Sequence, residues 1–468
     1  MINEFVSLVN NILWGDGQVL IIMLLACGIW FTVKLGGVQL RHFGHMFSLL
    51  KGSNTSSKDG ISSFQALCTS LSARVGTGNL AGVAVAISLG GAGAIFWMWM
   101  IALLGMATGF AESVLGQLYK VRDENGEFRG GPAYYIKQGL NKTWLAVAFS
   151  LCLFFGYGFV FSAVQANTIT DALNNAYAFP TEYVGLAIIA LAALIVVGGL
   201  KSIARFAEFV VPFMGIGYVL VALAITFINI SELPAMLLDI IKSAFGLQEA
   251  GAGALGAAIK NGIQRGLYSN EAGSGSVPHA AASAVPNPNH PVSQGYIQML
   301  GVFLDTLILC TSTAFIILLA GGSSSDQMEG IRLTQDAMSS HLGEGGTDFV
   351  AAAISLFAFT SVVANYAYGE SNLHMFKLDN KIGRAVYTIG YLGMIYWGAQ
   401  AALPQVWAMA DMALGLMTVI NIIAIVWMTP TIVSISKDYF KKKDSGENME
   451  YKVGDCEIQG KSEDGIWD

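Results

Sequence analysis

Charged side chains are scarce in this sequence: Asp, Glu, Lys and Arg make up 12% of its 468 residues, whereas about 25% is usual in soluble domains. This scarcity argues against a cytosolic enzyme. The formal net charge of −7 leaves no excess of Lys and Arg for phosphate groups, which excludes DNA and RNA as partners. The five cysteines lack the spacing of a metal site or a disulfide framework: Cys27, Cys68, Cys152, Cys310 and Cys456.

Catalytic and nucleotide-binding motifs are also missing. The sequence has no H-E-x-x-H zinc motif, no G-x-S-x-G nucleophile motif and no G-x-x-x-x-G-K-[ST] phosphate loop. Residues 76–81 fit the dinucleotide pattern G-x-G-x-x-A, but that site needs an acid about 20 residues later, and no Asp or Glu lies between Asp59 and Glu112. We therefore predict neither an enzyme nor a bound cofactor, and an ion gradient rather than ATP as the energy source.

The chain has instead long runs without charge, and 54% of its residues are hydrophobic. Crossing about 30 Å of hydrocarbon takes roughly 20 helical residues, and the run from 75 to 111 is long enough for two such helices. We predict an all-α integral membrane protein with about eleven transmembrane helices. Breaks at Gly, Pro and polar clusters put these helices at residues 18–36, 61–89, 94–120, 143–176, 183–200, 206–229, 252–284, 292–321, 349–377, 383–401 and 405–437.

The positions of Lys and Arg predict the orientation. If every second loop is cytoplasmic, starting with residues 34–60, that side receives 20 of the 25 basic residues, as expected for short cytoplasmic loops. The N-terminus is then outside and the C-terminus inside, in a bacterial or archaeal inner membrane. No cleavable signal peptide is apparent. Residues 444–468 are polar, mostly acidic and without apolar periodicity, so we expect a disordered cytoplasmic tail.

Two predicted helices are interrupted by hydrophilic, glycine-rich stretches at residues 72–79 and 268–276. Irregular backbone at this depth is tolerated only where it lines a cavity or is buried in protein, although glycines that merely allow close helix packing are the alternative. The interruptions lie five helices apart, as in transporters built from inverted repeats. This predicts an N-terminal segment (1–60), a first repeat (61–229), an external connection (230–251) and a second repeat (252–443).

Interrupted helices suit a zwitterionic ligand. Free amides at the start of a half-helix donate hydrogen bonds to a carboxylate, and exposed carbonyls and hydroxyls at a half-helix end coordinate Na⁺. Ionised side chains are not required for this chemistry. Two charges still stand out: Arg74 and Glu271 lie within the interruptions and are candidates for a pair, and Asp305 is a candidate for a proton-linked or ion-linked carboxylate.

Five motifs resemble the alanine/glycine:cation symporter family, the bacterial and archaeal sodium:alanine symporters. They are F-Q-A-L-C-T-S-L-S-A-R-V-G-T-G-N (64–79), G-G-A-G-A-I-F-W-M-W (90–99), G-G-P-A-Y-Y (130–135), S-N-E-A-G-S-G-S (269–276) and N-Y-x-Y-G-E (365–370). The resemblance implies a carrier of the LeuT-type five-plus-five fold that moves L- or D-alanine or glycine together with Na⁺. Membrane lipid is the remaining expected partner.

The resemblance also implies roles for matching residues. Gly76, Thr77 and Gly78 would face the carboxylate of the ligand, and Asn79 would bind or neighbour Na⁺. Other residues expected at the ligand are Phe161 as a lid, Gln165, Asn167, Asn270, Gly273 and Asn365. A sodium site would use the backbone oxygens of Ser72 and Val75 and the hydroxyls of Thr360 and Ser361.

One position departs from the best-known pattern of this family. Some members carry Trp where this chain has Asn365. Asparagine leaves more volume and offers both a donor and an acceptor. The alternative prediction is therefore a larger polar ligand such as glutamine, asparagine or serine, moved by the same mechanism. An uncoupled facilitator or channel is the other alternative.

Overall fold

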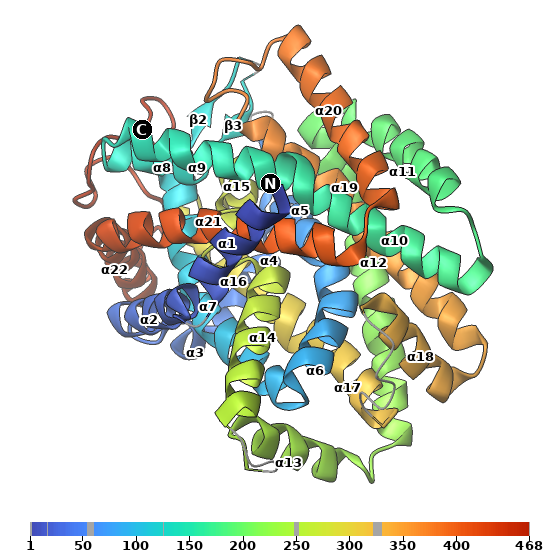
Figure 1. The fold of residues 1–468 in the computed structure, drawn as a ribbon. Coiled ribbons are helices and arrows are strands. Elements are labelled where there is room, and N and C mark those ends of the chain that lie inside the picture. Colours follow the sequence, from blue (N-terminus) through green and yellow to red (C-terminus); the bar gives the residue numbers. More distant parts are fainter. Residues whose placement is uncertain are drawn as a thin grey trace.

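The computed structural model describes residues 2–15, 17–53, 60–124, 126–247, 252–321 and 330–467. Helices dominate this part of the chain (Figure 1). Six of its helices are long and apolar enough to cross a membrane, and a seventh span results if the bent pair formed by the first two helices is counted as one. The structure therefore confirms a mostly helical chain with several helices able to cross a membrane.

In the first half of the chain, helices cover each segment that the sequence analysis expected to be helical. This half contains two π-helical segments. Gly78–Gly82 directly precedes α6, and Gly156–Val160 joins α9 to α10. The α-helices are α1 (Ile2–Trp14), α2 (Val19–Lys34), α3 (Val38–Arg41), α4 (Phe43–Leu50), α5 (Ser63–Arg74), α6 (Val83–Gly90), α7 (Gly93–Leu118), α8 (Pro132–Gly139), α9 (Thr143–Phe155), α10 (Phe161–Tyr177), α11 (Thr181–Val196), α12 (Gly199–Ile228) and α13 (Leu233–Ala244).

The second half of the described chain is also mostly helical and also contains a π-helical segment. A π-helical segment, Phe303–Cys310, joins α16 to α17. The α-helices are α14 (Ala252–Asn270), α15 (Val277–Ser283), α16 (Pro291–Val302), α17 (Thr311–Leu319), α18 (Ile331–Leu342), α19 (Gly345–Ser371), α20 (Lys381–Gln400), α21 (Leu403–Trp427) and α22 (Thr429–Ser445).

Both predicted interruptions are present, and they lie beside each other. The helix α5 packs against α15, and α6 packs against α14. The short strand β1 (Ile61–Ser62), which precedes α5, pairs in parallel with β4 (Ala284–Val285), which follows α15. Because β1 precedes its helix and β4 follows its helix, the two interrupted helices run in opposite directions with their breaks at the same level.

The start of α5 is fixed by local sequence. Ser62 and Gln65 form a capping box, in which each side chain accepts a hydrogen bond from the backbone of the other. A second strand pair, β2 (Val121–Arg122) with β3 (Phe128–Arg129), is antiparallel and follows α7. These elements position the ends of the helices that carry the site.

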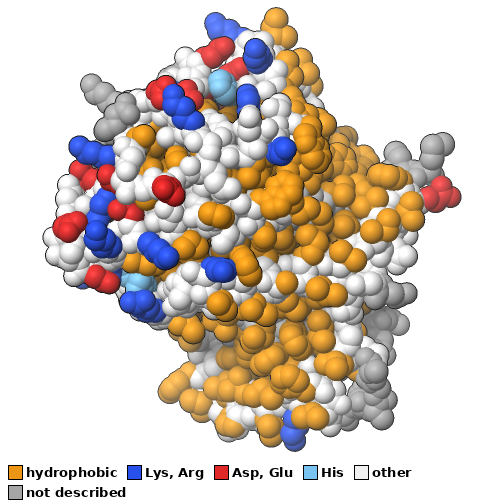
Figure 2. Space-filling view, turned by 90° about the vertical axis from the view of Figure 1, so that its left-hand side faces the viewer, with side chains coloured by type: hydrophobic (Ala, Val, Ile, Leu, Met, Phe, Trp, Pro, Cys, Tyr) orange, Lys and Arg blue, Asp and Glu red, His pale blue; other side chains and the backbone are white. Residues whose placement is uncertain are grey.

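The outer surface separates apolar from charged side chains (Figure 2). A broad hydrophobic area covers much of the face in view, and Lys, Arg, Asp and Glu gather at one end of the molecule. On α12, the side chains of Phe209, Phe213 and Phe227 are 80%, 74% and 75% exposed. Large exposed apolar areas of this kind fit contact with lipid.

The C-terminal tail does not match the disorder that we expected. Residues 446–467 pack against the helical body, and Tyr451 and Trp467 are buried. The Tyr451 amide donates to the Asn289 carbonyl (3.0 Å), and the Trp467 indole donates to the Leu118 carbonyl (3.2 Å). The expectation was wrong because two well-separated aromatic anchors are enough to dock a polar segment that lacks any apolar periodicity.

Candidate functional site

The first interruption presents backbone amides to a single side-chain oxygen. The Thr77 amide and the Thr77 hydroxyl both donate to Oε1 of Gln165, at 2.9 and 2.8 Å. The Gly76 amide donates to Oδ1 of Asn79 (2.9 Å). All of these groups are buried. The interruption therefore holds donors that already bind a carbonyl-type oxygen, and a carboxylate oxygen has the same acceptor chemistry.

A small internal cavity lies next to this interruption. It contains three of the predicted ligand-binding residues, Phe161, Gln165 and Asn365, and has about 10 Å³ of internal space. Several polar atoms around it are buried without a hydrogen-bond partner in the structure: Oδ1 of Asn365, the hydroxyl of Tyr268, and Nε and Nη2 of Arg74. Such groups are costly to bury, so the cavity is lined for a polar occupant.

Three of the five predicted sodium ligands, Ser72, Val75 and Ser361, come together at the first interruption. The predicted Thr360 hydroxyl donates to the Phe357 carbonyl (2.8 Å). The Ser361 hydroxyl donates to the carbonyls of Ser72 (2.9 Å) and Val75 (3.4 Å). The Ser72 hydroxyl donates to the Thr360 carbonyl (2.8 Å). The set consists of carbonyl and hydroxyl oxygens at the end of a half-helix, which is the donor set that discontinuous membrane helices offer to Na⁺.

A second group of oxygens surrounds Asp305, which is completely buried. Its Oδ1 accepts a hydrogen bond from Nδ2 of Asn79 (2.7 Å), and its Oδ2 accepts from the hydroxyls of Ser269 (2.7 Å) and Thr306 (2.8 Å). In the part of the chain that the structure describes, no ion pair joins Asp305 to Lys or Arg. The carboxylate thus connects both interruptions through neutral partners alone.

Ser269 was not assigned a role from the sequence, although it stands in one of the family-like motifs. The structure places its Cα 3.1 Å from the position of a Cβ at Gly78, so the two interruptions touch at this point. Ser269 could have been identified from the sequence because it is the first serine of the second interruption. It lies at the level of Asn79 in the first interruption.

Seven of the ten predicted ligand-binding residues do not line the internal cavity, and three of these seven form their hydrogen bonds elsewhere. Asn167 donates to the carbonyls of Gly398 (2.9 Å) and Ala401 (2.7 Å) at the end of α20. Oδ1 of Asn270 accepts from the Ala272 amide (3.0 Å), within the second interruption. The Gly273 amide donates to Glu112 (3.1 Å). The structure therefore separates these residues from Gln165 and Asn365.

The expected pair of Arg74 and Glu271 is not formed among the described residues. Nη1 of Arg74 points to the Gln298 carbonyl (3.4 Å), and Oε2 of Glu271 accepts from the Ser276 hydroxyl (2.6 Å). Both residues line the internal cavity. They contribute one positive and one negative group to its wall without contacting each other.

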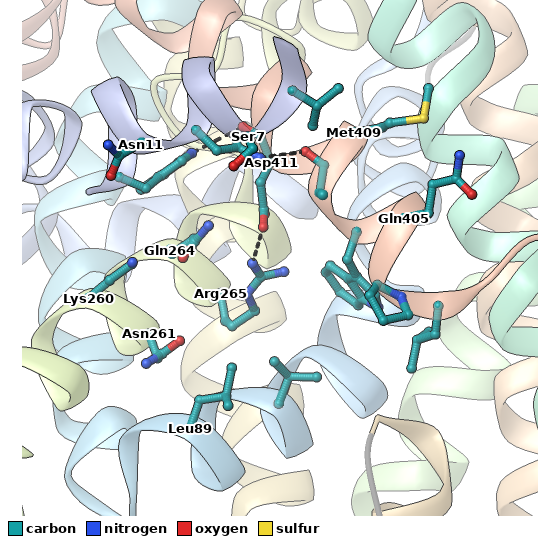
Figure 3. Close-up of a pocket in the computed structure, with 18 of the residues that line it drawn as sticks. Ser7, Asn11, Leu89, Lys260, Asn261, Gln264, Arg265, Gln405, Met409 and Asp411 are labelled. Atoms are coloured by element: carbon teal, nitrogen blue, oxygen red, sulfur yellow. Dashed lines mark hydrogen bonds and ion pairs between the residues drawn. The ribbon is translucent and has the colours of Figure 1, made fainter. Parts of the chain in front are cut away.

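A second, larger cavity has a volume of about 980 Å³ (Figure 3). Its wall includes side chains of α1, α14 and α21, and α1 was not predicted from the sequence. At its base, Nη2 of Arg265 is 2.6 Å from Oδ2 of Asp411. The Arg265 guanidinium also lies over the Trp407 ring, 4.5 Å from its centroid. We call this large cavity the vestibule.

Below the vestibule, aromatic rings separate it from the internal cavity. The Trp407 ring is 4.7 Å from that of Tyr268, and the Tyr268 ring is 5.9 Å from that of Phe161. Phe161 lines the internal cavity, and its role as a lid stays a prediction. The ion pair and the rings close one end of the site. Helical periodicity does not relate Arg265 to Asp411, because they are 146 residues apart.

The opposite end of the site is closed by a second group of charges. Nε of Arg129, on β3, is 3.0 Å from Oδ2 of Asp123. Its Nη2 is 3.9 Å from Oε2 of Glu370 at the end of α19. The Tyr134 hydroxyl donates to the Ser371 carbonyl (2.9 Å), which joins α8 to the same helix end. These contacts hold β3, α8 and the end of α19 together.

Comparison with known proteins explains this arrangement. Residues 1–453 match the family described as the sodium:alanine symporter family. The chain belongs to this family. The resemblance drawn from the sequence motifs is thereby confirmed, and the chain is a multi-pass membrane transporter rather than an enzyme.

Several relatives in the family are similar over nearly their whole length. The "Probable sodium/glutamine symporter GlnT" of Bacillus subtilis is 45% identical over 96% of this chain and 93% of the relative. The "Amino-acid carrier protein AlsT" of the same organism is 43% identical over 96% and 95%. The "Sodium/alanine symporter AgcS" of Methanococcus maripaludis is 37% identical over 93% and 97%. The relatives are thus named as carriers of different amino acids, and Na⁺-coupled amino-acid symport is common to the family.

Proposed function

We propose that this symporter carries a small neutral amino acid, L- or D-alanine or glycine, into the cell together with Na⁺. The observation that carries the proposal is the first interruption, where the Thr77 amide and hydroxyl bind the Gln165 carbonyl oxygen beside an enclosed cavity. A ligand carboxylate takes the place of this oxygen, while Na⁺ occupies the oxygen cluster of Ser72, Val75, Thr360 and Ser361. The names of the relatives support the same coupling ion.

The proposed architecture is an eleven-helix, five-plus-five inverted repeat in the inner membrane, with an outside N-terminus and a cytoplasmic C-terminus. The antiparallel arrangement of the two interrupted helices supports it, because opposite insertion of two repeats produces this arrangement. In this orientation the vestibule opens to the outside. The Arg129 group then lies at the cytoplasmic end.

Coupling follows from the order in which these groups change partners. When Na⁺ binds the carbonyls of Ser72 and Val75, the Ser361 hydroxyl no longer needs to donate to them. The ligand carboxylate then fills the amides of the first interruption and releases Gln165. Na⁺ and ligand stabilise the same closed geometry, so each binds more tightly in the presence of the other. Opening of the ion pair at one end and of the Arg129 group at the other then alternates access.

A polar ligand of the glutamine type is the second candidate. Oδ1 of Asn365 is buried in the cavity wall without a partner, and Nε and Nη2 of Arg74 are unpartnered in the same wall. A primary carboxamide offers a donor for the first and an acceptor for the second. The name of the GlnT relative agrees with this alternative.

Uptake into proteoliposomes tests both candidates. We expect an inward Na⁺ gradient to drive labelled alanine above its equilibrium level, whereas a facilitator or channel only equilibrates it. If the polar subsite operates, excess glutamine inhibits this uptake, and Asn365→Leu weakens that inhibition roughly tenfold, as expected for a lost buried hydrogen bond, while alanine uptake persists. No Na⁺-driven accumulation of any neutral amino acid contradicts the proposal, and no inhibition by glutamine removes the second candidate.

The Arg265–Asp411 ion pair yields a separate prediction. In Asp411→Asn the charge that holds Arg265 is lost, so the closure at the vestibule weakens. We expect a Tyr268→Cys reporter to react at least tenfold faster with a membrane-impermeant thiol reagent in this background. Lys260→Gln is the matched control, because Lys260 lines the same vestibule outside the pair. Equal labelling rates in the two backgrounds would show that the pair does not control access.

A further inference from the structure

Glu112, in the C-terminal part of α7, is completely buried and accepts three hydrogen bonds. The Gly273 amide donates to its Oε1 (3.1 Å), and the Gly275 amide (3.2 Å) and Nδ2 of Asn421 (2.7 Å) donate to its Oε2. We propose that Glu112 is a positioning residue for transport: its carboxyl group fills the amides of the second interruption, which it shapes and closes to the ligand carboxylate. The inference rests on the proposed symport.

The backbone of the second interruption explains why one carboxylate can bind two of its amides. Glu271, Gly273 and Gly275 have φ values of 58°, 94° and 86°. Alternation of left-handed with ordinary residues turns successive amides toward one side and forms a concave anion-binding site. Glycine is required at Gly275, where a Cβ would lie 2.6 Å from Cγ of Pro132. The sequence therefore builds an anion site, and Glu112 occupies it.

The same carboxylate is connected to two further helices. Nδ2 of Asn421, on α21, also donates to the Gly273 carbonyl (2.9 Å), and its Oδ1 accepts from the Tyr135 hydroxyl on α8. Nδ2 of Asn421 thus bridges Glu112 and the interruption, while its Oδ1 connects them to α8. Because α8 also bonds to the end of α19 through Tyr134, displacement of these helices carries the second interruption with them.

The two interruptions are satisfied in different ways, and this separates their roles. In the first, the Thr77 amide binds the neutral, rotatable side chain of Gln165. In the second, the Gly273 and Gly275 amides donate to the carboxyl group of Glu112, and Asn421 donates to the same group. A ligand carboxylate displaces a neutral amide more readily than a fixed carboxylate. The ligand is therefore bound at the first interruption, and Gly273 acts without touching it.

Glu112→Gln tests this inference. The new NH₂ group faces the Gly275 amide or Asn421, so a donor opposes a donor. We expect the maximal rate of Na⁺-driven uptake to fall at least tenfold, while the equilibrium Kd for labelled alanine changes less than threefold. Ser113→Ala is the matched control, because the buried Ser113 hydroxyl on the same helix has no partner, and it should transport normally. An unchanged rate, or a Kd that rises as much as the rate falls, would overturn the positioning role.

A charge exchange distinguishes positioning from simple loss of folding. Asn421→Asp alone places two acids together and should impair uptake. In Glu112→Gln/Asn421→Asp the new amide donates to the new acid, although the bond from residue 421 to the Gly273 carbonyl is lost. We expect the double variant to transport at least threefold faster than either single variant. The decrease in its thermal unfolding temperature in detergent should likewise be smaller than the sum of the decreases in the two single variants. Additive losses in both measurements contradict the inference. If no Na⁺-driven uptake is found, the proposed symport fails, but the unfolding measurement still tests the role of Glu112. The failure of the proposed function and the failure of this inference are therefore distinguishable.

Discussion

Gly76→Ala is expected to reduce Na⁺-driven uptake by roughly a hundredfold, the scale of a misplaced binding group. A Cβ at this position would lie 2.3 Å from Oγ of Ser361 and 2.7 Å from Oε1 of Gln165. Real Cβ atoms do not approach other atoms so closely. Ser361 belongs to the proposed sodium site and Gln165 marks the proposed position of the ligand carboxylate, so one methyl group disturbs both sites at once.

The measurement is initial uptake of labelled alanine into proteoliposomes with an imposed Na⁺ gradient. Gly82→Ala provides the control, because a Cβ there meets its nearest neighbours only at 3.7 Å and should leave uptake within about twofold of the unsubstituted protein. The two variants change the same residue type along the same interrupted helix. Uptake by Gly76→Ala that matches the control would show that the first interruption does not bind the transported solutes.

The position of the interruptions could be predicted from the sequence because the signal is local. Glycines and hydroxyl residues replace apolar residues for about two turns, and no packed helix needs such a stretch. The cluster of Ser72, Val75, Thr360 and Ser361 was also predicted, but only through the family resemblance. The physical reason is that its two halves are 289 residues apart, beyond what periodicity can relate.

Two polar residues of α10 illustrate what helical periodicity leaves out. Gln165 and Asn167 stand two positions apart on α10, and such positions point to different faces of a helix. Gln165 faces the first interruption, whereas Asn167 faces the end of α20. Because Gln165 and Asn167 are both polar, the sequence does not indicate which of the two helix faces points toward the first interruption. The sequence likewise could not reveal that the Gly273 amide donates to Glu112, which is 161 residues away along the chain.

Asp305→Asn is expected to weaken the Na⁺ stimulation of uptake at least tenfold. An ionised side chain at this depth in a membrane is costly unless a cation or protons balance it, and among the described residues the partners of Asp305 are neutral donors: Asn79, Ser269 and Thr306. A coupling cation next to Asp305 would balance the charge and join both interruptions. Asparagine keeps the size but removes the charge, so the attraction for a cation is lost.

The measurement is alanine uptake as a function of external Na⁺ at constant ionic strength. We expect the half-saturating Na⁺ concentration of Asp305→Asn to rise at least tenfold, or uptake to lose its Na⁺ stimulation entirely. Asp336→Asn removes the same charge from an exposed position on α18 and should leave the Na⁺ dependence unchanged. If Asp305→Asn retained the original Na⁺ dependence, the cluster of Ser72, Val75, Thr360 and Ser361 would have to provide coupling alone, because it holds the other set of converging oxygens at the first interruption.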